Sequence, residues 1–355
     1  MGKIRVLVAD DSLTVRRFLV DALSVDPEFE VVGEARDGQE AVALCRDLKP
    51  DVVTLDMVMP LLDGIGATEQ IMAYHPTPIL IVSSASNRGE AFRTYDALSA
   101  GALDAMDKPD GRPEGDWERR FRSTLKLVSR IKVITHPRAK LGIPSQSPVS
   151  LPQPTRASGY ELVVIGASTG GPTAIQRVLQ GLPPTYPLPI VIVLHLGASF
   201  ADSLVAWLND ASPIPVRMAK DGEPLPRVGT PQVLIAPGEQ HLKLAGGLLR
   251  LSDEDEVHSS RPSVDILFHS VAREKPGRAI ACLLTGMGRD GADGLLALRK
   301  TGSMTIAQDE ETSIIYGMPR AAVQLGAASC VLPLEQIPAS LTRLADAPQP
   351  SKGQE

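Results

Sequence analysis

The sequence lacks the features of several large protein classes. Its three cysteines lie far apart and form no C-x-x-C pair, which argues against a disulfide framework or a cysteine metal site. No apolar run approaches the roughly 18 residues that a membrane-spanning helix needs. The formal net charge is −6 and the basic residues are scattered, so no basic face is available for nucleic acid. We therefore expect a cytoplasmic protein with reduced cysteines, no membrane insertion and no nucleic-acid partner.

The chain is long enough for two hydrophobic cores. It has 355 residues, whereas single cores rarely extend past roughly 250 to 300. Strand and helix patterns alternate in residues 3–132 and again in residues 159–346, which predicts two α/β domains. Residues 133–158 are rich in proline and serine and contain no acidic residue, so they are expected to form a semi-stiff linker. Residues 347–355 are expected to be a disordered tail.

The first domain is predicted to contain five βα units around a parallel sheet with helices on both faces. The expected strands are residues 4–9, 30–34, 52–56, 79–83 and 102–106. Reactive side chains lie at the carboxyl ends of four of these strands: Asp10, Asp11, Asp56, Ser83 and Lys108. Ligands of such sheets bind at the carboxyl ends of the strands. Carboxylates gathered there would repel one another unless a hard cation were present, and oxygen ligands suit Mg²⁺.

Four segments of this domain resemble the receiver domains of two-component response regulators. They are Val8-Ala-Asp10-Asp11-Ser, residues 54–64 around Asp56, Val82-Ser83-Ser84 and Asp107-Lys108-Pro109. The resemblance implies that Asp56 accepts phosphate from a histidine kinase. It also implies the residues that bind Mg²⁺ and the phosphoryl group. The metal ligands would be Asp10, Asp11, Asp56 and the backbone carbonyl of Val58, and the phosphoryl contacts would be Ser83 and Lys108.

An alternative interpretation is that these polar groups are helix caps and solvated acids at loop ends. It explains any one of the five but explains all of them together poorly. One departure from the receiver pattern concerns Ala105, three residues before Lys108, where many receivers have an aromatic residue that moves on phosphorylation. We therefore expect the signal to pass through other contacts near Ser83 and the last βα unit.

In the second domain, the apolar run that begins at Leu162 stops at Gly166-Ala-Ser168-Thr-Gly170-Gly171-Pro172. A buried parallel strand followed by a tight turn into a helix is predicted, with Ser168 at the turn. Such a turn exposes a serine hydroxyl beside helix-start N–H groups, as acyl transfer requires. The G-x-S-x-G spacing alone fits a phosphate-binding or purely structural glycine turn equally well.

Two downstream residues favour the nucleophile interpretation. His195 ends the expected strand 190–194, and Asp290 follows the expected strand 279–284, so both belong at the carboxyl edge with Ser168. A base and an orienting acid are what a serine nucleophile needs. The spacing permits a triad without proving one. His241, His258 and His269 compete for the role of base.

The three competing histidines have different settings. His241 opens an expected antiparallel hairpin around Gly246-Gly247, where either a structural role or a contact with substrate fits. His258 lies in an acidic loop and is expected to be solvated. His269 lies in an apolar helix and is expected to be packed or on the surface.

The whole second domain resembles the chemotaxis protein-glutamate methylesterases, a family that also carries a receiver domain. The segments that show it are 165–171, 194–200, 235–241, 261–265, 284–292, 308–310 and 316–320. The resemblance implies that Ser168 is the nucleophile, His195 the general base and then acid, and Asp290 the residue that fixes the His195 tautomer. It places Thr169 and Met287 at the oxyanion site. Ser260 departs from the family pattern, which usually has histidine there.

The predicted function is therefore a hydrolase activated by phosphorylation of Asp56. It would demethylate glutamate γ-methyl esters and deamidate glutamines on the cytoplasmic helices of chemoreceptors, giving adaptation in chemotaxis. The phosphodonor would be a chemotaxis-type histidine kinase, the ester chemistry would need no metal, and a monomer is expected. A transcription factor is the rival from another class, but the second domain contains no compact basic helix-turn-helix. A catalytically inactive interaction module stays open.

Overall fold

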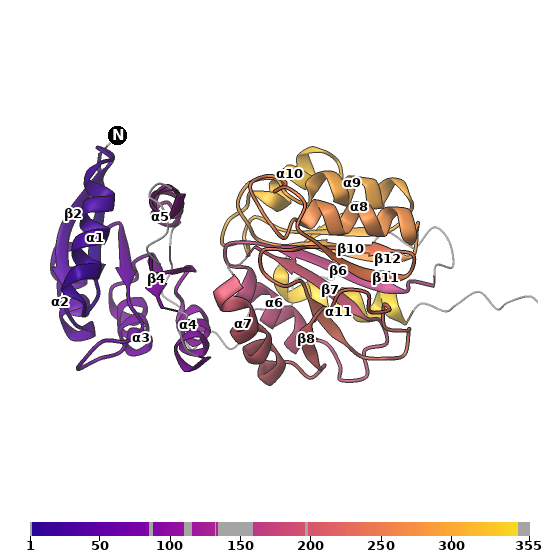
Figure 1. Cartoon of the computed structure of the whole chain (residues 1–355), viewed down its shortest axis with the longest axis horizontal. Helices are drawn as coiled ribbons and strands as arrows, with labels where there is room; N and C mark the ends of the chain where they lie inside the picture. Colours follow the sequence, from indigo (N-terminus) through magenta and orange to yellow (C-terminus); the bar gives the residue numbers. More distant parts are fainter. Residues whose placement is uncertain are drawn as a thin grey trace, which may run out of the picture. The chain divides into compact units, whose positions relative to one another are not determined.

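The computed structural model describes residues 2–84, 88–109, 116–131, 133, 159–195 and 198–346. The chain divides into two compact units, Met1–Ser145 and Gln146–Glu355, and each is described on its own (Figure 1). Apart from residue 133, the expected linker and the expected tail lie outside the described residues. Within the described part of the chain, no helix has both the length and the hydropathy of a membrane span.

The first unit is a five-stranded parallel sheet in the order β2-β1-β3-β4-β5. Its strands are β1 (Ile4–Ala9), β2 (Phe29–Ala35), β3 (Val52–Leu55), β4 (Ile79–Ser83) and β5 (Asp104–Asp107). Its helices are α1 (Leu13–Ser24), α2 (Gly38–Leu48), α3 (Gly64–Tyr74), α4 (Arg88–Ala100) and α5 (Asp116–Val128). The predicted (βα)5 fold is confirmed. Because β2 and β3 lie on opposite sides of β1, the strand order reverses there, at the edge where ligands of such sheets bind.

Short polar side chains set where the helices of this unit begin. Ser12, Asp37 and Asp63 each precede a helix and accept a hydrogen bond from its first turn. The Ser12 cap starts α1 after Asp10 and Asp11, so both carboxylates stay in the loop that follows β1. The cap at Asp63 likewise leaves residues 56–62 as a loop after β3.

The second unit contains a seven-stranded parallel sheet in the order β14-β13-β12-β6-β7-β9-β8, with a separate antiparallel hairpin of β10 and β11. Its strands are β6 (Leu162–Ala167), β7 (Ile190–Leu194), β8 (Val216–Met218), β9 (Val233–Ile235), β10 (His241–Ala245), β11 (Leu248–Ser252), β12 (Ala279–Leu283), β13 (Met304–Gln308) and β14 (Cys330–Leu332). The doubly wound sheet and the inserted hairpin that the sequence predicts are confirmed.

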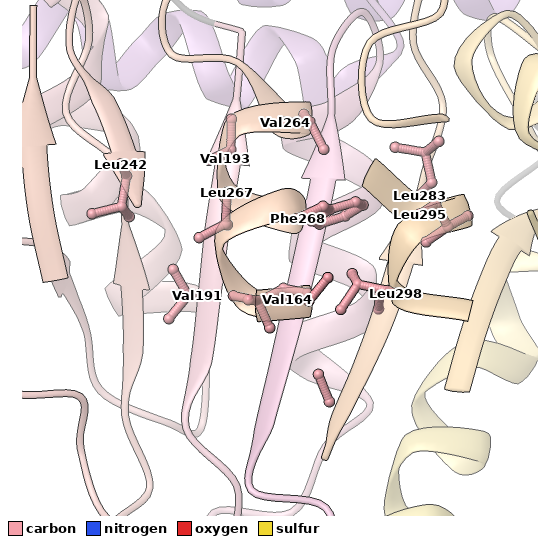
Figure 2. Packing of buried hydrophobic residues seen from close by; sticks show 14 of the residues in the cluster. Val164, Val191, Val193, Leu242, Val264, Leu267, Phe268, Leu283, Leu295 and Leu298 are labelled. Atoms are coloured by element: carbon pink, nitrogen blue, oxygen red, sulfur yellow. The ribbon is translucent and has the colours of Figure 1, made fainter. Parts of the chain in front are cut away.

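Helices cover both faces of this sheet (Figure 1). They are α6 (Gly171–Gln180), α7 (Ala198–Ala211), α8 (Val264–Glu274), α9 (Ala292–Lys300), α10 (Met318–Gln324) and α11 (Ile337–Ala345), with a 3₁₀ turn η1 (Leu334–Gln336). On one face, Leu267 and Phe268 of α8 pack against strand residues such as Val164 and Val191 (Figure 2). This core fixes the start of α8 against the carboxyl ends of the central strands.

Candidate functional site

Ser168 lies at the carboxyl edge of the seven-stranded sheet, directly after its strand β6. Ala167, the last residue of β6, pairs with Leu194 of β7, and the His195 N–H donates to the Ala167 carbonyl at 3.2 Å. On the other side, the Ser168 N–H donates to the carbonyl of Thr285, just after β12, at 3.0 Å. Ser168 therefore lies between His195 and the loop that leads to Asp290. The strand order reverses around β6, which is where such sheets bind ligands.

The turn after Ser168 depends on glycine. Gly170 precedes α6 with a φ of +75°, and a Cβ there would lie 2.8 Å from Ile314. Gly286, in the loop after β12, lies so close that its Cβ would be 2.8 Å from the Cβ of Ser168. Only glycine allows this backbone angle and these approaches without strain. The predicted strand-to-helix elbow is thus present, and a second loop packs tightly against it.

His195 and Asp290 form a direct pair. The His195 Nε2 lies 2.7 Å from Asp290 Oδ2, and the carboxylate is buried. Three further groups donate to this carboxylate: the Ser263 hydroxyl at 2.7 Å, the Val264 N–H at 2.7 Å and the Asp265 N–H at 3.0 Å. Burial raises the pKa of Asp290, but the hydrogen bonds from His195 and Ser263 outweigh it and leave that pKa below its usual range. Asp290 is therefore ionised at neutral pH.

The donors to Asp290 belong to the start of α8, whose position depends on two glycines. Val264 fills the space beside Gly166 of β6 and Gly291, where a Cβ would lie 2.2 Å and 2.6 Å from its side chain. Because α8 lies this deep, its first N–H groups point at the carboxylate. The positive end of the helix dipole also favours a negative charge at this place.

The orientation of His195 leaves its Nδ1 for proton transfer. With Nε2 held by Asp290, Nδ1 lies 3.4 Å from the Ser260 hydroxyl. Within the described residues, no hydrogen bond joins the Ser168 hydroxyl to His195. Ser260, noted in the sequence only as a departure, is thus a neighbour of the candidate base. No motif predicts that contact, because Ser260 lies in the loop between β11 and α8, which has no regular pattern.

Within the described residues, none of the three competing histidines is hydrogen-bonded to Asp290 as His195 is. His241 is fully buried and its ring nitrogens hydrogen-bond to backbone groups of Ser263 and Asp255, which favours the structural role over a contact with substrate. His258 is exposed, as expected, and its Nε2 lies 3.1 Å from Asp265 Oδ2. His269 is partly buried on α8, as expected. Ser263 is a further residue that sequence reasoning missed, although a serine before an apolar helix pattern is a recognisable cap signal.

The two candidate oxyanion residues lie on segments that are tied together. The Thr285 hydroxyl donates to the Thr169 carbonyl at 3.0 Å and accepts from the Ile315 N–H at 2.9 Å. The Thr285 N–H donates to the buried Gln308 side chain at 2.8 Å. These bonds hold Thr169 and Thr285 together beside Ser168. Since the Ser168 N–H already donates to Thr285, a different N–H must serve an oxyanion.

The first unit gathers a separate polar cluster. Ligand oxygens of Asp10, Asp11 and Asp56 all lie within 4.8 Å of one another. Lys108 Nζ lies 2.8 Å from Asp10 Oδ2 and 3.0 Å from Asp56 Oδ2. Burial raises the pKa of Asp56 to about 6, with Lys108 opposing that rise. The predicted convergence of these residues is present.

The chemistry of this cluster fits Mg²⁺ and a phosphoryl group. Three carboxylates supply the oxygen ligands that a hard cation prefers. The Ser83 hydroxyl is buried and has no hydrogen-bond partner within the described residues. An unpaired buried hydroxyl is costly, and a phosphoryl oxygen would satisfy it. Val58 follows Asp56 in the exposed loop, where its carbonyl is a candidate ligand.

Comparisons with known proteins cover both units. The family model described as CheB methylesterase matches residues 163–341, and that of the response regulator receiver domain matches residues 6–114. A protein-glutamate methylesterase/protein-glutamine glutaminase 2 of Anaeromyxobacter dehalogenans is 47% identical over 342 residues, which cover 96% of this chain and 97% of that protein. A protein-glutamate methylesterase/protein-glutamine glutaminase of Nitrosospira multiformis is 44% identical over 346 residues, with shares of 96% and 97%.

A solved structure is also similar. The crystal structure of the Thermotoga maritima CheB methylesterase catalytic domain is 38% identical, with a TM-score of 0.49. The match covers 52% of this chain and 98% of that one.

Proposed function

The chain belongs to the CheB family of protein-glutamate methylesterases and protein-glutamine glutaminases with a receiver domain, which act in chemotaxis adaptation, and we propose that Ser168, His195 and Asp290 carry out its reaction. One observation carries the assignment. The His195–Asp290 pair, 2.7 Å apart, lies at the end of the strand next to the one that Ser168 follows. The nucleophile, the base and the acid thus come from three neighbouring strand ends.

In the first half of the reaction, Ser168 Oγ attacks the γ-carbonyl carbon of a glutamate methyl ester. The hydroxyl proton passes to His195 Nδ1, since Nε2 is held by Asp290. His195 then gives this proton to the methoxy oxygen as the ester C–O bond breaks, and methanol leaves. With a glutamine substrate the C–N bond breaks and ammonia leaves. The product in both cases is a glutamyl ester of Ser168.

In the second half, water attacks the glutamyl ester. His195 Nδ1 takes a proton from the water and returns it to Ser168 Oγ, which restores the enzyme and leaves a glutamate. Asp290 stays ionised throughout and stabilises the imidazolium of His195, as its lowered pKa supports. We assign the backbone N–H groups of Thr169 and Met287 to the oxyanion that forms in each half.

The test is replacement of Ser168 by alanine. Ser168→Ala should abolish methanol release from membranes with methylated chemoreceptors, because it removes the hydroxyl that forms the glutamyl ester. Ser24→Ala, which changes an exposed serine of the first unit, is the matched control and should leave the rate unchanged. Near-normal release by Ser168→Ala would refute the assignment.

We also propose how the receiver unit works. Asp56 would accept a phosphoryl group from a chemotaxis-type histidine kinase, and this would raise esterase activity. Mg²⁺ would be held by Asp10, Asp11, Asp56 and the Val58 carbonyl. Bound there, it would neutralise charge on the phosphoryl oxygens.

The Ser83 hydroxyl and Lys108 would contact the phosphoryl group, and the unpaired state of that hydroxyl supports this role. The receiver and catalytic domains would be residues 3–132 and 159–346, with residues 133–158 as the linker. We propose that the substrates are the cytoplasmic helices of methylated chemoreceptors. The protein would act on them in the cytoplasm as a monomer.

A further inference from the structure

His241 is a fully buried histidine that the reaction above does not use. It begins β10, and both of its ring nitrogens are hydrogen-bonded to backbone groups. Nδ1 accepts from the Ser263 N–H at 3.1 Å, and Nε2 lies 3.0 Å from the Asp255 carbonyl. The ring therefore links the loop that contains Asp255 to the residue that precedes α8.

These two bonds allow one state of the ring. A backbone N–H can only donate, so Nδ1 must be unprotonated where it meets Ser263. A carbonyl can only accept, so Nε2 must carry the proton that is directed at Asp255. His241 is thus the neutral Nε2–H tautomer.

Ser263, the partner of His241, is the cap residue of α8. Its hydroxyl donates to Asp290 Oδ1 at 2.7 Å, and the next two N–H groups of the chain donate to the same carboxylate. Among the described residues, these are three of the four donors to Asp290, and the fourth is His195. A shift of the backbone at Ser263 would therefore move most of the groups that hold Asp290.

A second link keeps His241 and α8 in register. The Leu244 N–H of β10 donates to the Ser270 hydroxyl of α8 at 2.9 Å. This bond fixes β10 along α8. His241, at the start of β10, adds a second bond between the two elements, at Ser263 just before α8 begins.

We infer that His241 is a positioning residue for the esterase and deamidase reactions. Its ring fixes the backbone position of Ser263, and the Ser263 hydroxyl orients the carboxylate of Asp290. Asp290 in turn orients the ring of His195. The inference rests on the proposed roles of Asp290 and His195. It gives His241 no contact with substrate, in keeping with its complete burial.

Two substitutions of His241 separate its two bonds. In His241→Asn, the side-chain oxygen can take the place of Nδ1 and accept from Ser263, while the bond to Asp255 is lost. In His241→Gln, the longer amide can reach the place of Nε2 and donate to Asp255, while the acceptor for Ser263 is lost. Both variants replace an aromatic ring with an amide, so they are matched in polarity.

The measurement is methanol release by the full chain as the amount of methylated receptor membrane is varied. We expect His241→Gln to lower kcat on the order of 10-fold to 100-fold with KM unchanged within about twofold, since misplaced catalytic groups cost about this much. His241→Asn should keep kcat within about fivefold of wild type. Thermal unfolding of both variants serves as the control for folding.

Ser263→Ala keeps the N–H that His241 binds but removes the hydroxyl that donates to Asp290. It should lower kcat by about 10-fold, and adding His241→Gln to it should cost less than the product of the two single losses, because both act through Asp290. The inference would be overturned if His241→Asn and His241→Gln lost kcat equally. It would also be overturned if His241→Gln or Ser263→Ala kept the wild-type kcat, or if the two losses multiplied in the double variant. Ser168→Ala is measured alongside. If Ser168→Ala is active, the proposed reaction is wrong; if it is inactive, the results above test the role of His241 alone.

Discussion

Replacing Asp290 with asparagine is a severe test of the proposed triad, because the change is nearly isosteric. Both carboxylate oxygens accept backbone N–H bonds, from Asp265 at 3.0 Å and from Val264 at 2.7 Å. The amide NH₂ of Asp290→Asn must therefore face one N–H donor, whichever way it turns. If it turns toward His195, it donates to Nε2, and the proton of the ring moves to Nδ1. A ring protonated at Nδ1 cannot accept the Ser168 proton.

The expected loss in kcat is about 10⁴-fold, the size typical of a wrong histidine tautomer, which corresponds to about 5.5 kcal/mol of activation free energy. KM should change little, since Asp290 is buried and does not contact substrate. The assay is initial methanol release from methylated receptor membranes at several membrane concentrations. His195→Gln should lose several orders of magnitude as well. The double variant should lose little more, because triad members act as a unit.

The matched control is Asp293→Asn. Asp293 lies three residues further on, is 41% exposed and pairs with Arg289 at 2.8 Å. This variant has the same change in charge but should keep wild-type kcat, since exposed ion pairs contribute little. An Asp290→Asn enzyme within about tenfold of wild type, or losses that multiply in the double variant, would refute the triad.

Three further predictions concern the receiver unit and the neighbour of His195. Asp56→Asn should not be phosphorylated by a small-molecule phosphodonor and should keep only basal esterase activity; equal activation of this variant and wild type would contradict the switch. Removal of Mg²⁺ by EDTA should stop phosphorylation but leave the basal rate unchanged, and Asp11→Ala should weaken Mg²⁺ binding, as a titration followed by tryptophan fluorescence or calorimetry would measure. Ser260→Ala should change kcat less than about fivefold, because its contact with His195 Nδ1 is at the long limit of a hydrogen bond, worth at most about 1 kcal/mol; a larger loss would make Ser260 part of the catalytic machinery.

The sequence predicted most of the sheets because their strands are continuous apolar runs. Residues 162–167 and 190–194 could hardly be anything but buried parallel strands. By contrast, β8 has only three residues around Arg217 at the edge of the sheet, and α10 has only seven. Neither is long enough to show the repeat of apolar residues by which a strand or a helix is recognised. Both were missed. Their existence depends on tertiary contacts rather than on local pattern.

The candidate site was predictable in its parts but not in its connections. Motifs placed Ser168, His195 and Asp290 at strand ends, and parallel strands bring such ends together. No local pattern could say that His195 meets Asp290 through Nε2, or that His241 lies behind Ser263. Those contacts depend on the path of residues 253–263, a loop without periodicity. The acidic cluster of the first unit was easier to predict, because each of its members directly follows a strand.

The wedge of Val264 between Gly166 and Gly291 has a consequence for mutational tolerance. Neither glycine carries a reactive atom, yet a single methyl group at either would compete with Val264 for space and lift the start of α8. A larger side chain at Gly166 or Gly291 would thus displace the N–H groups that stabilise the charge on Asp290. Selection on catalysis should therefore restrict these two glycines as strictly as the reactive side chains, and attempts to stabilise the fold by replacing glycine with alanine should spare them.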